Sequence, residues 1–324
     1  MKSVQLVNVP RGKADTQVYM QSFCQSWVTN GGDYVSRPQI LRKKWFKNMV
    51  KGISLTGVHW GNSSDAYLVC SRGQHLLKSC LPFNFKGEII PMLWDCWPYT
   101  WKSLEHDLRL LNVKLCFMTA SDVIDRFSKI FPDTKFVHIP EGLDMSDYVP
   151  GLPLSERNID VYEIGRKYPA YHQKLIEAGL DKKCSFIYLN KKPDGKTFIF
   201  DTFEKYRNAL CNSKITVSFP ASVTDAVNTS VETLTMRYWE SMLSRCVIVG
   251  YCPKELYNLL GYNPVVEADI SHAAAQLEEI LSNISSYQSL VDRNREVALK
   301  NAAWDYRIEF IFKVLEQSGY SVHS

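Results

Sequence analysis

Two glutamates stand eight residues apart in the segment VETLTMRYWESMLSRCVIVG, with Glu232 near its start and Glu240 in its middle. On a helix, eight residues carry the second carboxylate roughly 12 Å along the axis and about 80° around it. Residues 228–230 are Asn, Thr and Ser, so we expect a helix that begins there and offers free amides to a phosphate. Glu240 would then accept two hydroxyls, such as those of a ribose. An ordinary amphipathic helix with two solvated glutamates is the alternative.

Loops that follow apolar runs carry further candidates. Gly12 lies between Arg11 and Lys13 after the run SVQLVNV, where a glycine lets the backbone approach a phosphate or a sugar. Arg166 and Lys167 follow IDVYEI, and the planar guanidinium of an arginine matches phosphate oxygens. A plain turn and ordinary surface charge are the alternatives at these two places.

Asp95 stands in the aromatic segment WDCWPYTW, residues 94–101, after another apolar run. A carboxylate at a strand end can orient or deprotonate an acceptor hydroxyl, and the aromatic rings can stack on a sugar. Aromatic residues at this density are also typical of a domain core. Residues 37–51, RPQILRKKWFKNMVK, form a basic amphipathic pattern that suits an anionic membrane surface, a phosphate-bearing acceptor, or a helix covering a sheet.

Composition indicates a globular protein of two domains. The chain has 324 residues, of which 45% are hydrophobic and 22% charged, and no run approaches the roughly 20 apolar residues of a membrane span. The start of the chain does not resemble a signal peptide, so we expect a cytoplasmic protein, with residues 37–51 as a candidate for peripheral membrane contact. The nine cysteines include no CxxC pair, and we expect reduced thiols and no structural metal. The motifs GxSxG, GxGxxG and Walker A are absent, which argues against a serine hydrolase and the usual dinucleotide and ATP sites.

The net charge of +4 is unevenly distributed, since residues 1–150 carry a balance of +5 and the remainder a balance of −1. Short apolar runs alternate with helical patterns throughout the chain. They are SVQLVNV, DAYLVCS, EIIPMLW, KLCFMTA and KFVHIP in the first half, and IDVYEIG, CSFIYLN, KITVSFP, CVIVG and PVVEA in the second. Continuously apolar strands separated by helices predict parallel sheets covered on both faces.

We therefore predict an α/β protein with two doubly wound, Rossmann-like domains. The boundary is expected in residues 142–158, where Gly, Pro, Ser and Asp cluster. A helical pattern over residues 285–319, with Trp304, Ile308, Ile311 and Leu315 on one stripe, is longer than the second sheet needs and is expected to cross back to the first domain. Ligands of open parallel sheets bind beyond the carboxyl ends of the strands, which predicts sites facing a cleft between the domains.

The segment KITVSFPASVTDAVNTSVETLTMRYWESMLSRCVIVG, residues 214–250, resembles the donor-binding core of the retaining nucleotide-sugar glycosyltransferases of the GT-B fold. This family 4-like group carries an E-x7-E signature, which Glu232 and Glu240 match. The resemblance implies an acceptor-binding domain over residues 1–150, with a C-terminal helix at about 305–324, and a donor-binding domain over residues 151–304.

The same resemblance implies roles for individual residues. Glu240 would hold the ribose of a UDP- or GDP-sugar, and Glu232 would contact the donor sugar. The backbone amides of Thr233, Leu234 and Thr235 would receive phosphate, and Arg166 would neutralise the leaving diphosphate. The family usually adds a lysine where this chain has Ala170 or Tyr171, so Lys167, Lys174 or Arg237 would take its place. Residues 235–236 also depart from the glycine-containing stretch of the family.

The resemblance implies transfer of a sugar, with retention of configuration, to a hydroxyl of a glycan or glycolipid in polysaccharide biosynthesis. The nucleotide sugar is a substrate, and neither a cofactor nor a metal is implied. Two alternatives remain: an enzyme acting on modified bases of DNA, which would use the positive first half, and a catalytically silent protein that binds nucleotides or glycans.

Overall fold

The computed structural model describes residues 1–8, 18–38, 48–49, 52, 65–163, 165–191, 197–224 and 231–322. Internal contacts divide the chain into two compact units. Unit 1 comprises Met1–Leu143 and Trp304–Ser324, and unit 2 comprises Asp144–Ala303. The assignment of acceptor binding to one half and donor binding to the other stays a prediction. None of the helices among the described residues is both long enough and apolar enough to cross a membrane.

Unit 1 is built on a parallel sheet with the strand order β12-β1-β3-β4-β5-β6, and β2 pairs with β1. The strands are β1 (Lys2–Val7), β2 (Tyr34–Val35), β3 (Asp65–Arg72), β4 (Glu88–Trp94), β5 (Leu115–Met118), β6 (Lys135–His138) and β12 (Tyr320–Ser321). The inner strands β3, β4 and β5 are buried along most of their length. This burial accounts for their continuously apolar sequences, because each face of the sheet is covered.

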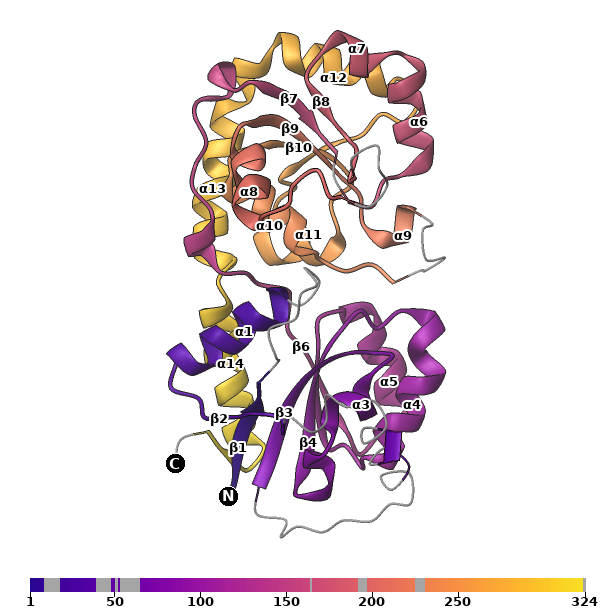
Figure 1. Ribbon diagram of the computed structural model, residues 1–324, viewed down its shortest axis with the longest axis vertical. Helices are drawn as coiled ribbons and strands as arrows, with labels where there is room; N and C mark the ends of the chain where they lie inside the picture. Colours follow the sequence, from indigo (N-terminus) through magenta and orange to yellow (C-terminus); the bar gives the residue numbers. More distant parts are fainter. Residues whose placement is uncertain are drawn as a thin grey trace. The chain divides into compact units, whose positions relative to one another are not determined.

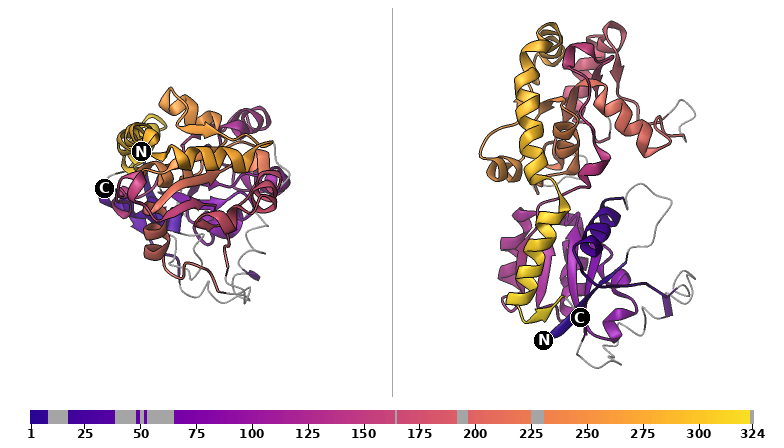
Figure 2. Two further views of the ribbon diagram at one scale, coloured as in Figure 1. Left: turned by 90° about the horizontal axis from the view of Figure 1, so that it is seen from above. Right: turned by 90° about the vertical axis from the view of Figure 1, so that its left-hand side faces the viewer.

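Helices cover the two faces of this sheet. They are α1 (Val18–Thr29), α3 (Leu76–Cys80), α4 (Trp101–Leu110), α5 (Ile124–Ile130) and α14 (Trp304–Gln317). Helices α1 and α14 contact each other on one side of the sheet, and α3, α4 and α5 lie on the other (Figures 1 and 2). Short 3-10 helices lie at η3 (Phe83–Phe85), η4 (Pro98–Thr100) and η5 (Ser121–Val123).

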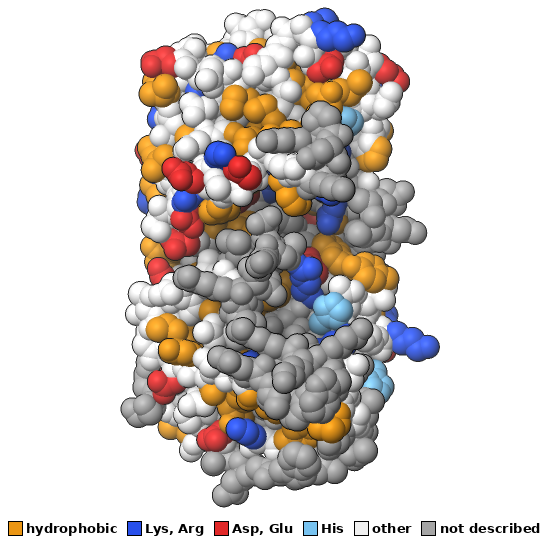
Figure 3. Space-filling view, viewed as in Figure 1, with side chains coloured by type: hydrophobic (Ala, Val, Ile, Leu, Met, Phe, Trp, Pro, Cys, Tyr) orange, Lys and Arg blue, Asp and Glu red, His pale blue; other side chains and the backbone are white. Residues whose placement is uncertain are grey.

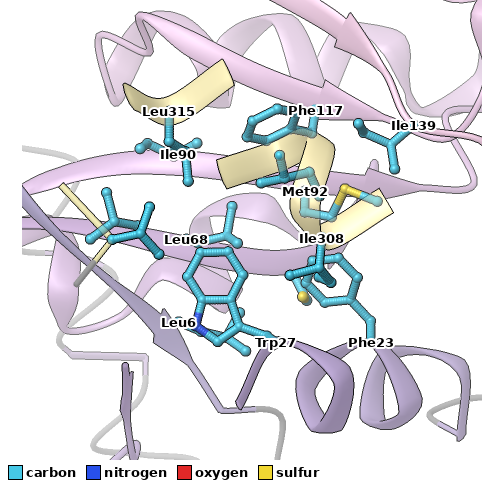
Figure 4. Packing of buried hydrophobic residues seen from close by; sticks show 14 of the residues in the cluster. Leu6, Phe23, Trp27, Leu68, Ile90, Met92, Phe117, Ile139, Ile308 and Leu315 are labelled. Atoms are coloured by element: carbon cyan, nitrogen blue, oxygen red, sulfur yellow. The ribbon is translucent and has the colours of Figure 1, made fainter. Parts of the chain in front are cut away.

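The core of unit 1 confirms the predicted return of the C-terminal helix. Figure 4 shows Phe23 and Trp27 of α1 and Ile308 and Leu315 of α14 packed with strand residues such as Leu68. The four predicted stripe residues of α14 are at most 1% exposed. The helical pattern over residues 285–319 is interrupted, however, because α13 (Gln288–Asn301) and α14 are separate helices. The break falls where the chain passes from unit 2 to unit 1.

Unit 2 contains a second parallel sheet with the order β11-β10-β9-β7-β8. Its strands are β7 (Ile159–Tyr162), β8 (Phe186–Ile187), β9 (Ser213–Ser218), β10 (Val247–Gly250) and β11 (Val265–Glu267). Its helices are α6 (Pro169–Glu177), α7 (Leu180–Lys183), α8 (Phe203–Cys211), α9 (Ala221–Thr224), α10 (Met236–Leu243), α11 (Lys254–Leu260), α12 (Ala273–Ser282) and α13, with η6 (Met145–Asp147), η7 (Leu154–Glu156) and η8 (Ile284–Tyr287). All ten predicted strands are therefore present.

The prediction that a helix begins at residues 228–230 and includes Glu232 is wrong. Helix α10 begins at Met236, and Thr235 is its N-cap residue with extended backbone angles of φ −110° and ψ 153°. Val231, Thr233 and Thr235 are β-branched, which lowers their helix propensity. The separation of 12 Å and 80° calculated for a continuous helix therefore does not apply. Gly12 and most of the basic pattern, residues 39–47 and 50–51, lie outside the described residues.

Candidate functional site

The candidate site lies at the carboxyl edge of the unit 2 sheet. Strands β7, β9 and β10 run parallel, so the loops that follow them meet at one edge. Eight predicted site residues belong to this unit: Arg166, Lys167, Glu232, Thr233, Leu234, Thr235, Arg237 and Glu240. The loop after β7 carries the first two, and the connection from β9 to β10 carries the other six.

Glu232 is a buried carboxylate, 8% exposed, that is held by the start of α11. Its Oε1 accepts a hydrogen bond of 2.5 Å from the backbone amide of Lys254, and Ser222 Oγ donates to its Oε2 at 3.5 Å. The Lys254 amide is the first of the helix, where a negative charge is favourable. The charge of Glu232 also raises the pKa of Tyr251, together with burial and a hydrogen bond between these two side chains.

Glu255 of α11 holds the segment between the two signature glutamates. Glu255 Oε2 accepts a hydrogen bond of 2.6 Å from the Leu234 amide and a longer one of 3.3 Å from Thr233 Oγ1. Glu255 is 8% exposed and Leu234 is fully buried. The Leu234 amide, which the sequence assigned to phosphate, therefore already has an acceptor. Thr235 is half-buried at the N-terminus of α10.

Arg237, in the first turn of α10, lies against the loop after β7 that carries the predicted cations Arg166 and Lys167. Arg237 Nη1 donates to the backbone oxygen of Arg166 at 3.2 Å. Gly165 has φ +93°, a conformation that residues with a side chain rarely adopt, and a Cβ there would lie 2.3 Å from Arg237 Nη2, so a larger residue would be strained and would displace the guanidinium. Burial lowers the pKa of Lys167, and the charge of Arg237 lowers it further, while Glu163 opposes both. Lys167 and Arg237 thus lie close enough for the charge of Arg237 to affect the pKa of Lys167.

The lysine positions of the family supply no cation in this chain. Ala170 is exposed on α6, and Tyr171 is fully buried and packs on Phe219. Lys174, one of the three suggested substitutes, is exposed on the same helix. Of the three suggested substitutes, Arg237 is the one that bonds to the backbone beside Arg166.

Glu240 lies further along α10 and is only 6% exposed. The hydroxyl of Tyr148 donates to its Oε1 and the hydroxyl of Tyr206 to its Oε2, both at 2.7 Å. Burial raises the pKa of Glu240, and the two tyrosine hydrogen bonds and the charge of Arg237 oppose this increase. The carboxylate is therefore fixed at both oxygens.

A further acidic group at this edge, Glu163, was not anticipated. Glu163 follows β7 directly, is 2% exposed, and its Oε2 lies 2.5 Å from Nδ1 of His172 in α6. Sequence reasoning missed this pair and also Tyr148 and Tyr206. The two tyrosines are 92 and 34 residues from Glu240, so no local spacing relates them to it. The position of Glu163 beside the predicted Arg166 was the one available signal.

A pocket of about 210 Å³ lies beside Glu232 in unit 2, lined among others by Tyr251, Lys254, Tyr257 and Glu267. Two of these residues, Tyr251 and Lys254, hydrogen-bond to the Glu232 carboxylate. Among the described residues, no three His, Cys, Asp or Glu side chains are grouped as metal ligands would be.

Asp95 belongs to unit 1, at the carboxyl end of β4. Its backbone has φ 53°, and its Oδ2 lies 3.3 Å from Nε of Arg72 at the end of the neighbouring strand β3. In the aromatic segment, Trp94 and Trp97 are 3% and 5% exposed and form core, whereas Tyr99 is 62% exposed. The stacking surface predicted here is therefore reduced to Tyr99 and the partly exposed Trp101.

No family model and no curated protein matches the sequence. Solved structures do match along nearly the whole chain. HepE of Anabaena, in complex with UDP and glucose, has a TM-score of 0.62 at 9% identity, covering 98% of this chain and 100% of its own. Sucrose-phosphate synthase of Thermosynechococcus elongatus has a TM-score of 0.61 at 10% identity, covering 98% and 99%. AviGT4, a glycosyltransferase involved in avilamycin A biosynthesis, has a TM-score of 0.54 at 10% identity, covering 97% and 96%.

These likenesses define the class of fold. Two parallel, Rossmann-like sheets, each in its own unit, and a C-terminal helix that belongs to the first unit make up the GT-B fold of glycosyltransferases. The protein has this fold, as the sequence predicted.

Proposed function

We propose that the protein is a glycosyltransferase that moves a sugar from a UDP- or GDP-sugar to a hydroxyl of a glycan or glycolipid, with retention of anomeric configuration. The observation that carries the proposal is the grouping of cations and carboxylates at one edge of the unit 2 sheet. Arg237 lies against the loop of Arg166 and Lys167, and Glu240 follows it by three residues in α10.

The cations suit the leaving group. Departure of a nucleoside diphosphate develops negative charge, which preorganised cations stabilise more strongly in the transition state than in the ground state. Arg166, Lys167 and Arg237 supply that charge, and α10 directs its positive end toward the same loop. Burial is the main cause that lowers the pKa of Lys167, and a diphosphate between the cations would relieve the smaller contribution from the charge of Arg237.

The carboxylates suit the sugar parts of the donor. Glu240 accepts the ribose hydroxyls and Glu232 contacts the transferred sugar. The sugar develops oxocarbenium character and takes the acceptor hydroxyl on the face that the diphosphate leaves, so no enzyme nucleophile is required. Acceptor binding is assigned to unit 1, where Asp95 and Arg72 pair at the carboxyl edge of the sheet. The solved structure of HepE with UDP and glucose supports UDP as the first nucleotide to test.

The alternative of a DNA acceptor gains no specific support from the described surface. On the face shown in Figure 3, acidic and basic side chains of the described residues are interspersed, whereas a phosphate backbone is usually met by a patch of positive charge. The placement of Arg237 in turn weakens the argument for a silent protein, which rested on the missing lysine.

The deciding experiment is a screen of melting temperature with UDP, GDP, CMP, ADP and their common sugar conjugates. A ligand at 100 times its dissociation constant stabilises the native state by about 2.7 kcal/mol, which is readily measured. We expect a shift with UDP or GDP, and release of that nucleotide from its sugar conjugate when glycan acceptors are added. Binding without turnover across an acceptor panel would identify the silent protein. The absence of any shift would overturn the donor assignment.

A further inference from the structure

Both oxygens of the Glu240 carboxylate are occupied by tyrosine hydroxyls. Tyr148 and Tyr206 donate to different oxygens over equal distances of 2.7 Å. These lengths are typical of O–H···O hydrogen bonds. A buried carboxylate that lacked such donors would favour its protonated form. The two hydroxyls therefore offset much of the free-energy penalty of burying this charge.

The two tyrosines are held by a shared set of contacts. Tyr148 follows η6, and Tyr206 lies in α8. Arg207, the neighbour of Tyr206, donates to the backbone oxygen of Asp147 at 2.7 Å and forms an ion pair with its carboxylate. The ring of Phe203 packs edge-on against Tyr148 at 6.3 Å and stacks on Tyr206 at 5.8 Å. The hydroxyls are therefore fixed by packing as well as by Glu240.

Two further groups face this carboxylate. Arg237 precedes Glu240 by three residues in α10, and its charge lowers the pKa of Glu240. Tyr162, at the end of β7, has its pKa raised by burial and by the charge of Glu240. The Tyr162 hydroxyl makes no hydrogen bond within the described structure. The donors that fix the carboxylate are thus Tyr148 and Tyr206.

The geometry leaves Glu240 with capacity for a diol. An ionised carboxylate has about four acceptor positions, two on each oxygen. One position on each oxygen is used by a tyrosine, which leaves one on each. Two acceptors on adjacent oxygens match two vicinal hydroxyls, and the tyrosines prevent the carboxylate from turning away from them.

We propose that Tyr148 and Tyr206 are positioning residues that orient Glu240 and keep it ionised, so that it selects ribose over 2′-deoxyribose in the nucleotide of the donor. This inference rests on the proposed function, because it assigns the ribose to Glu240.

The first arm of the test needs no nucleotide. Carboxyl titration is followed by NMR in full-length protein labelled at glutamate, with Glu240→Gln used to assign the signal. We expect Tyr148→Phe and Tyr206→Phe each to raise the pKa of Glu240, because each removes a hydrogen bond to the charged form. Tyr320→Phe is the matched control, since it removes a 2.6 Å tyrosine hydrogen bond to Glu88 in unit 1. An unchanged Glu240 titration in both variants would overturn the proposal.

The second arm compares the affinities of UDP and 2′-deoxy-UDP between pH 5 and pH 8. We expect wild type to prefer UDP, and each phenylalanine variant to reduce that preference by about tenfold, the usual effect of losing a hydrogen bond to a charged group. Acidification weakens UDP binding by protonating Glu240, and in the variants this loss should begin at higher pH. A purely structural role would lower both affinities equally without moving the pH profile.

The outcomes of the two arms separate the two proposals. Tighter UDP binding in the variants would mean that the tyrosines compete with the ribose, and it would overturn the positioning role. A wild-type protein that binds neither UDP nor GDP would overturn the proposed function and the ribose assignment with it, whereas the titration arm would still report whether the tyrosines hold Glu240 ionised.

Discussion

Arg237 has two neighbours that determine its role, the backbone of Arg166 and the position of Gly165. Its guanidinium donates a hydrogen bond to the backbone oxygen of Arg166. It also occupies the space that a side chain at position 165 would need. A lysine at 237 would keep the charge but lose the planar fork that donates to a backbone oxygen and, in the proposed function, to a phosphate as well. The arginine is therefore suited to replace the lysine that the family has at the positions of Ala170 or Tyr171 in α6, the helix after β7.

We expect Arg237→Ala to weaken UDP binding by about 10-fold to 100-fold, because it removes a charge-assisted contact to phosphate. Arg237→Lys should recover part of that loss. Isothermal titration calorimetry measures both variants. Lys174→Ala, which removes an exposed cation of α6, is the control and should bind UDP as wild type does. Equal affinities in Arg237→Ala and wild type would exclude Arg237 from the phosphate site.

The sequence indicated which residue types carry chemistry, but it did not indicate what holds them. Arg166 was identifiable because charged residues after apolar runs stand at strand ends, and Glu232 was identifiable by its spacing of eight residues from Glu240. The partners of Glu232 and Glu240 come from segments distant in the chain, such as Lys254 and Tyr148. Contacts of this kind depend on how the elements pack, and a pattern of residues in one segment does not contain that information.

At the level of elements, the strands were predictable and one helix boundary was not. Buried parallel strands produce apolar runs because each faces helices on both sides, so β3, β4, β9 and β10 are visible in the sequence. The spacing of Glu232 and Glu240 predicts that the segment before α10 is helical. The segment is not helical, because its β-branched residues disfavour a helix and α11 supplies hydrogen-bond acceptors and donors to it, and the spacing of the glutamates contains neither effect.

Glu255 should therefore stabilise the segment before α10. We expect Glu255→Ala to lower the free energy of unfolding by about 1–3 kcal/mol, because it leaves the buried Leu234 amide without its acceptor. Hydrogen exchange of that amide should accelerate more than exchange in β9. The control is Glu278→Ala, which removes an exposed ion pair with Lys183 and should change stability much less. Unchanged exchange at Leu234 would show that α11 does not hold the segment.

The close approach of Gly250 in β10 to Ser218 in β9 leads to a second prediction about stability. Gly250 has φ +154°, and a Cβ there would lie 1.8 Å from the backbone oxygen of Ser218. We expect Gly250→Ala to lower the free energy of unfolding by more than about 3 kcal/mol, because backbone of a central strand pair must move. Gly261→Ala, at φ +72° with open space around it, should cost only about 1 kcal/mol. Chemical denaturation measures both, and equal losses would contradict the argument from close approach.

Two hydrophobic core clusters of the described residues, one in each unit, share no residue. One comprises strand residues of unit 1 with α1 and α14, and the other comprises strand residues of unit 2 with α6 and α12. The chain enters unit 2 once and returns to unit 1 for its last helix. Unit 1 is consequently assembled from residues separated by the entire second unit. Its folding depends on a long-range contact that unit 2 does not need.

Substitution of Trp304 tests whether the last helix stabilises unit 1. It is 1% exposed, and its ring packs edge-on against Phe23 at 5.2 Å and Trp94 at 6.0 Å. We expect Trp304→Ala to destabilise unit 1 by about 3–5 kcal/mol through loss of buried area and the cavity that remains. Tyr306→Ala, 53% exposed on the same helix, is the control and should leave stability nearly unchanged.

The effect of Trp304→Ala on nucleotide binding follows from the location of the proposed donor site. Every residue assigned to it, including Arg237 and Glu240, belongs to unit 2. Calorimetry with and without UDP should therefore show that Trp304→Ala lowers the transition of unit 1, and that UDP still raises the transition of unit 2. UDP affinity below both transitions should match wild type. A loss of affinity in Trp304→Ala, with hydrogen exchange in unit 2 unchanged, would mean that unit 1 contributes to nucleotide binding, because no other part of the protein would have changed.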